Sequence, residues 1–76
     1  MALIEHFDSS DLQRPTRQRP AAANLSVFDL DGVTFLQIDT FGTPTRQMPG
    51  KRSQSIRLGR EAAIQLRDAI DKAFRQ

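Results

Sequence analysis

An Asp-Gly pair between two alternating apolar runs is the feature of this 76-residue chain that most constrains its fold. The run LSVFDL precedes Asp31-Gly32, and VTFLQIDTF follows it. An Asp-Gly pair supplies the positive backbone φ angles that a tight two-residue hairpin turn requires. The sequence therefore predicts an antiparallel hairpin with three facing pairs: Leu30 and Val33, Phe28 and Phe35, and Leu25 and Ile38.

The predicted hairpin carries apolar side chains on both of its faces near the turn. One face holds Leu25, Val27, Leu36 and Ile38. The opposite face holds Phe28, Leu30, Val33 and Phe35 and continues to Gln37 and Asp39. Because a two-layer domain buries only one face of an antiparallel sheet, the second face needs a partner. Another protomer, the N-terminal segment or a ligand could fill that role.

The chain after Phe41 predicts a second hairpin and then a helix. Pro44 and Pro49-Gly50 interrupt its first, strand-rich part, and the return strand covers about residues 53–58, where polar and apolar positions alternate. Gly59 ends that strand. Residues 60–75 predict a helix, because apolar residues recur there at helical spacing: Ala63, Leu66, Ile70 and Phe74. Residues 24–76 are therefore expected to form one α+β domain.

Residues 1–23 are expected to form a flexible leader. The stretch 8–23 is rich in Ser, Gln, Arg and Pro and shows almost no apolar period. An apolar cluster of Ala2, Leu3, Ile4 and Phe7 begins the leader. This cluster could dock onto the domain or be disordered, and the composition of the following stretch favours disorder.

Charge is distributed unevenly along the chain, although the formal net charge is only +2. Residues 24–41 contain three aspartates and no basic residue. Residues 42–60 contain no acid and five basic residues: Arg46, Lys51, Arg52, Arg57 and Arg60. A basic arm beside apolar strands suits a phosphate backbone. The alternative is a solvated loop, which is the commoner outcome for a lone charge run.

Small size and the absence of Cys predict a homodimer. A single core in a chain of this length supplies only about 3–5 kcal/mol, so such domains need additional stabilisation. Disulfides are excluded, and a zinc site is disfavoured by a single His and no thiol. Oligomerisation is the remaining source of stability. The chain also lacks a membrane-length apolar run and a signal peptide, which predicts a cytoplasmic protein, or a nucleoid-associated one if it is bacterial.

No catalytic, metal or cofactor site is predicted. His6 lies in the expected leader among acidic residues, where surface exposure is the usual outcome. Ser53 and Ser55 have no recognisable activating base. GTPTRQMPGK lacks the glycine spacing of a P-loop, and no Ser or Thr follows its Lys. The chain is therefore expected not to be an enzyme.

The order of elements and several motifs resemble the positive-cofactor-four transcriptional coactivator family, in particular a small, divergent bacterial member. The resemblance covers about residues 25–75 and rests on LSVFDLDG, FLQIDTF, PGKRSQSIRL and QLRDAI. The Pro-Gly pair, followed by two basic residues and an Ile-x-Leu strand, is its most specific part. The family implies a curved four-stranded antiparallel sheet of two hairpins, one C-terminal helix, and a dimer that binds single-stranded DNA in a channel.

The basic arm, the resemblance and an aromatic residue of the first hairpin together predict a set of nucleic-acid-binding residues: Arg46, Lys51, Arg52, Arg57 and Phe28. Lys51 and Arg52 match the family motif most directly. Other positions depart from it: the first hairpin presents Phe28, Leu30, Asp31 and Val33 where the family has basic residues and an aromatic, and Asp39 replaces a basic residue. Phe28 and Phe35 could stack on bases, or they could lie in the core or a dimer interface, which is favoured for Phe35.

Two functions follow. The first is a single-stranded DNA-binding accessory factor of transcription or replication, favoured by the basic arm. The second is a protein-interaction module that uses the apolar face of Phe28, Leu30, Val33 and Phe35. The acidic and apolar character of the first hairpin favours that second function.

Overall fold

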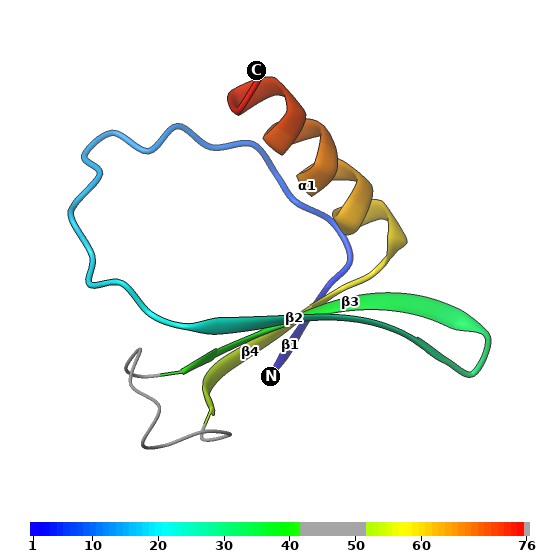
Figure 1. The fold of residues 1–76 in the computed structure, drawn as a ribbon. Coiled ribbons are helices and arrows are strands. Elements are labelled where there is room, and N and C mark those ends of the chain that lie inside the picture. Colours follow the sequence, from blue (N-terminus) through cyan, green and yellow to red (C-terminus); the bar gives the residue numbers. More distant parts are fainter. Residues whose placement is uncertain (42–51, 76) are drawn as a thin grey trace.

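The computed structural model of the protein describes residues 1–41 and 52–75. Its elements are β1 (Ala2–Ile4), β2 (Ala23–Leu30), β3 (Val33–Phe41), β4 (Arg52–Leu58) and α1 (Arg60–Ala73). The strands form one sheet in the order β1-β4-β3-β2. Figure 1 shows α1 rising on one side of this sheet. A four-stranded sheet followed by a C-terminal helix confirms the predicted α+β class.

The first hairpin has the predicted turn and register. Asp31 and Gly32 adopt φ angles of 53° and 80°, which a two-residue hairpin turn needs. Leu30 lies opposite Val33, Phe28 opposite Phe35, and Leu25 opposite Ile38. Thr34 Oγ1 donates a hydrogen bond of 2.5 Å to Asp29 Oδ1 across the strands. The assignment of side chains to the two faces of the hairpin follows directly from this register.

The predicted return strand is β4, which begins one residue earlier than expected. It pairs antiparallel with β3, placing Leu58 opposite Leu36 and Arg57 opposite Gln37. The register shifts between Thr40 and Phe41, at the end of the ladder nearest Arg52. The alternation in β4 therefore sends Arg57 to one face of the sheet and Leu58 to the other.

The fourth strand of the sheet is not the one that the sequence predicted. The expected first strand of the second hairpin falls on residues 42–51, outside the described residues. The strand next to β4 is instead β1, which runs parallel to it, with Ala2 opposite Ile56 and Ile4 opposite Leu58. The sheet is thus not purely antiparallel. Pairing with β1 satisfies backbone groups on the outer edge of β4 and half-buries Ile4.

The start of the leader is docked, which corrects the preference for disorder. The Gly59 N–H donates a hydrogen bond of 3.0 Å to the Ile4 carbonyl. The side-chain amide of Gln65 bonds both backbone groups of Phe7, accepting from its N–H at 2.8 Å and donating to its carbonyl at 3.0 Å. Sequence periodicity missed this docking because it depends on two partners more than 50 residues away in the chain.

Residues 8–22 contain no helix or strand and are exposed along their whole length. In Figure 1 they form a wide arc between the docked segment and β2. This arc agrees with the absence of apolar period in that stretch. In the structure, β2 begins at Ala23, and residues 2–4 form a strand of the same sheet. The division of the chain into a leader and a domain at residue 23 stays a prediction.

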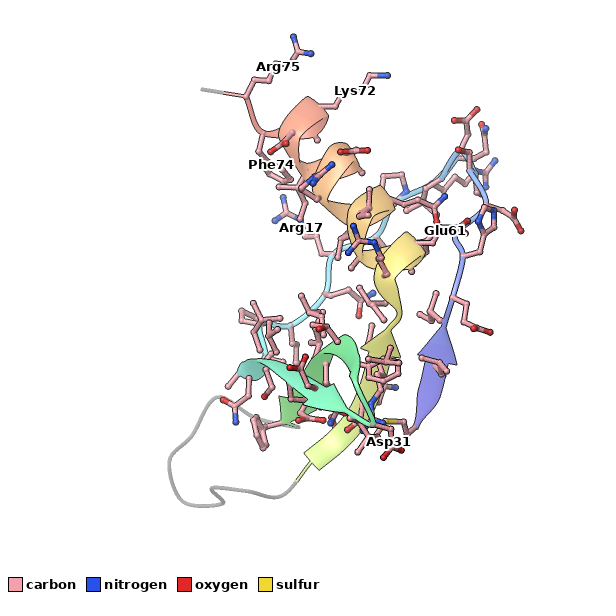
Figure 2. The ribbon with its side chains drawn as sticks, turned by 90° about the vertical axis from the view of Figure 1, so that its right-hand side faces the viewer. Arg17, Asp31, Glu61, Lys72, Phe74 and Arg75 are labelled. Carbon is pink, nitrogen blue, oxygen red and sulfur yellow. The ribbon has the colours of Figure 1, made fainter. Side chains whose placement is uncertain are left out.

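The core lies between α1 and one face of the sheet. Among the described residues, Leu58 and Ala62 are the fully buried apolar residues. The helix ends at Ala73, two residues before the predicted end, and the Phe74 N–H caps it by donating to the Ile70 carbonyl at 2.8 Å. The second half of its apolar stripe is uncovered, with Ile70 47% and Phe74 76% exposed. Figure 2 shows Phe74 at the helix end farthest from the sheet.

The two faces of the sheet differ in what covers them. The helix face packs against α1 and carries Leu25, Val27, Leu36, Ile38, Ile56 and Leu58. The open face, which no other described element covers, carries Phe28, Phe35, Gln37, Asp39, Ser55 and Arg57. No helix in the described part of the chain has the length and apolar character needed to cross a membrane.

Candidate nucleic-acid interface

A chain of polar side chains runs across β3 and β4 on the open face. Arg57 donates from Nε and Nη2 to Gln37 Oε1, at 2.9 and 2.7 Å. Gln37 Nε2 donates to Asp39 Oδ1 at 3.0 Å, and Ser55 Oγ donates to the same oxygen at 2.5 Å. Gln37 and Asp39 are only 7% and 6% exposed. Their burial is compatible with folding because each is hydrogen-bonded. These hydrogen bonds hold the Arg57 side chain in place.

The guanidinium of Arg57 lies over two phenylalanine rings. Its Cζ is 4.9 Å from the centroid of Phe28 and 5.7 Å from that of Phe35. The two rings have centroids 6.0 Å apart and an interplanar angle of 35°. These distances suit a cation–π contact with both rings. We call this group of Phe28, Phe35 and Arg57 the platform.

The platform has side chains suited to a polymer with flat bases and an anionic backbone. All three of its side chains are half-buried, so each still presents part of its surface to solvent. A guanidinium plane and an aromatic ring are both surfaces on which a nucleobase stacks. The guanidinium of Arg57 is also a cation that can attract a phosphate. Asp39, an acidic residue, lies on the same face.

The structure brings together two of the predicted site residues and separates another basic residue from them. Phe28 and Arg57 are in contact on the open face. Arg60, from the same basic run, is the first residue of α1 and lines a groove between that helix and the strands. Arg46 and Lys51 lie outside the described residues. Arg52 begins β4 opposite Phe41, and only its backbone is described.

Sequence reasoning missed Gln37 as the residue that holds Arg57. The signal was present, since the predicted faces place Gln37 and Arg57 on the same side of the sheet. The register between β3 and β4 was needed to make them neighbours, and this long-range register cannot be read from either strand alone. Phe35 was expected to be mainly a packing residue, and the structure shows that it also contacts Arg57.

His6 belongs to the docking of the N-terminal segment and not to the platform. Its Nδ1 is hydrogen-bonded to Glu61 Oε2, and its Nε2 lies 3.4 Å from Asp8 Oδ1. Figure 2 shows Glu61 on the first turn of α1, beside the N-terminal segment. The hydrogen bond to Glu61, assisted by the charges of Glu61 and Asp8, raises the pKa of His6 above its ordinary value of 6.5. The described residues contain no cluster of three or more potential metal ligands.

Comparisons with protein-family models, with curated proteins and with solved structures found no match.

Proposed function

We propose that the protein binds single-stranded nucleic acid, preferentially DNA, on the open face of its sheet, as a non-catalytic accessory factor of transcription or replication. One observation carries this proposal: Arg57 lies across the rings of Phe28 and Phe35 on a face that no other described element covers. Single strands expose unpaired bases that stack on such a surface with little sequence preference.

Two kinds of contact are expected to share the work. The platform supplies stacking and one fixed positive charge. Lys51 and Arg52, which directly precede or begin β4 in sequence, supply phosphate contacts. Phosphate contacts position a strand without reading its bases, so binding should be largely independent of sequence. A duplex hides its bases, and it should therefore bind more weakly than a single strand.

The direct test is a titration of labelled single-stranded DNA, duplex DNA and single-stranded RNA at several salt concentrations. The proposal expects the tightest binding to single strands and a steep loss of affinity with salt. Arg57→Lys keeps the charge but removes the planar guanidinium. This variant should lose affinity for single strands while the salt dependence stays close to that of the unmodified protein. Equal affinity for duplex and single strands would contradict the role of stacking.

A protein-interaction module is the second candidate, and a separate observation favours it. Leu30 and Val33, which face each other next to the turn, are both about half exposed. Exposed apolar pairs at a hairpin tip are common parts of protein interfaces. The double variant Leu30→Ser/Val33→Ser separates the two functions. It should leave single-strand binding unchanged if the platform is the nucleic-acid site. If the tip is the functional surface, the same variant should abolish binding of the protein partner.

A further inference from the structure

We propose that the outer edge of β2 is the interface with a second copy of this chain. The two β2 strands pair antiparallel about a two-fold axis at Ser26, which joins the two sheets into one of eight strands. This pairing is independent of nucleic-acid binding, because it uses the edge of the sheet and not the open face. It specifies the surface and the register of the expected homodimer.

Within the part of the chain that the structure describes, backbone groups on the outer edge of β2 have no strand partner at alternate residues. β2 lies at the end of the sheet, with β3 as its neighbour. The Phe41 N–H donates to the Ala22 carbonyl at 2.9 Å, which extends the β2–β3 register by one residue. Since hydrogen-bonded positions alternate along an antiparallel pair, even-numbered residues of β2 bond β3. The outward residues are therefore the odd-numbered ones: Ala23, Leu25, Val27 and Asp29.

Apart from the charge of Asp29 near its end, β2 has none of the usual features that protect an edge strand against pairing. Natural edge strands are usually interrupted by Pro, Lys or a bulge. The sequence ANLSVFDL contains no Pro and no basic residue, and its pairing with β3 is continuous from Ala23 to Leu30. Leu25 and Val27 are each 68% exposed on the helix face. The first residues of the chain pair with β4, and residues 8–22 do not cover this edge, as Figure 1 shows.

One register makes the edge complementary to itself. With Ser26 on the axis, all four outward residues pair, and Leu25 of each copy lies opposite Val27 of the other. Asp29, the only charged residue of β2, then lies opposite Ala23. A shift of the axis by one residue along the strand leaves fewer outward residues paired within β2. If the axis moves from Ser26 to Val27, toward the turn, Asp29 of one copy also lies opposite Leu25 of the other.

A second copy fits this edge better than an unrelated strand does. The two-fold pairing gathers four apolar side chains, Leu25 and Val27 from each copy, into one strip on the helix face. Each copy has few fully buried apolar residues among those described, so this strip adds burial that the single chain lacks. Isologous two-fold contacts are also the commonest form of protein self-association. Both platforms would lie on the same, open face of the joined sheet.

Cysteine cross-linking tests the register, because the chain has no Cys of its own. Ser26→Cys places two thiols opposite each other on the axis, in a non-hydrogen-bonded pair with Cα atoms about 4.5 Å apart. This spacing is within disulfide range. Asn24→Cys is the matched control on the same strand and face. Its two copies would be about 14 Å apart along the strands, too far for a disulfide. Mild oxidation at low micromolar concentration should therefore give a covalent dimer for Ser26→Cys and a monomer for Asn24→Cys.

Light scattering tests the edge itself. The unmodified protein should have the mass of a dimer at high micromolar concentration. Val27→Lys should weaken dimerisation by about tenfold or more, because it places a charge in the apolar strip. Leu12→Lys, at an exposed position of the residue 8–22 arc, should remain dimeric. Circular dichroism checks that both variants are folded. The proposal is overturned by a monomeric unmodified protein, by a Val27→Lys protein that dimerises normally, or by equal cross-linking of the two cysteine variants.

Discussion

The two faces of the sheet differ in what holds their side chains in place. On the helix face, apolar residues such as Leu58 are buried against α1. On the open face, burial is polar: Gln37 and Asp39 are buried although no helix of the described residues lies over them, and hydrogen bonds link them to Arg57 and Ser55. The helix face therefore supplies stability, whereas the open face holds a cation and two aromatic rings in place while they are still partly exposed to solvent.

The largest expected effect is on the helix face. Leu58→Ala should lower the free energy of unfolding by about 2–5 kcal/mol, because it removes the largest fully buried side chain described and leaves a cavity. A loss of this size is comparable with the whole stability of a small domain. Urea denaturation followed by circular dichroism measures it. Leu30→Ala, at the half-exposed hairpin tip, is the control and should cost much less. Equal losses for the two variants would contradict the division between the faces.

Removal of residues 1–7 should have the next largest effect. This deletion exposes the outer edge of β4 and breaks the two hydrogen bonds between Phe7 and Gln65. The melting temperature should fall by more than about 5 °C, the shift that roughly 1 kcal/mol produces in a domain of this size. Gln65→Ala should reproduce part of the loss, while Leu12→Ala, in the exposed arc, should have no effect. An unchanged melting temperature after the deletion would mean that the docking contributes nothing to stability.

The smallest effect is the pH dependence of His6. Its pKa in the folded protein is raised above 6.5, chiefly by the hydrogen bond to Glu61. The associated stability is therefore fully present below about pH 6.5 and is lost as the pH rises through the raised pKa. The difference in melting temperature between the unmodified protein and His6→Gln should be greatest near pH 6 and vanish near about pH 9. A difference that grows with pH would have the wrong sign. Because His6 is exposed, this difference in melting temperature should be small.

The sequence predicted best those parts of the fold that are set by local signals. The Asp31-Gly32 turn fixed the register of the first hairpin, and helical spacing located α1. The parallel pairing of β1 with β4 could not be predicted, because a three-residue strand has no period of its own and gains its partner only in the folded chain. The sequence predicted the platform only in part. Phe28 and Arg57 were singled out, but their contact depends on the long-range register between β3 and β4.

The most direct test of nucleic-acid binding is the salt dependence of single-stranded DNA binding by two variants, one on the open face and one on its flank. Phe28→Leu removes a stacking ring but keeps an apolar side chain, so it should cost roughly 1–3 kcal/mol of binding energy and leave the salt slope unchanged. Lys51→Ala/Arg52→Ala should instead flatten the log–log slope by about 0.7 for each phosphate contact removed. Circular dichroism confirms that each variant is folded. Binding on the open face is contradicted if the unmodified protein has no affinity for single strands at low salt, or if folded Phe28→Leu binds as tightly as the unmodified protein.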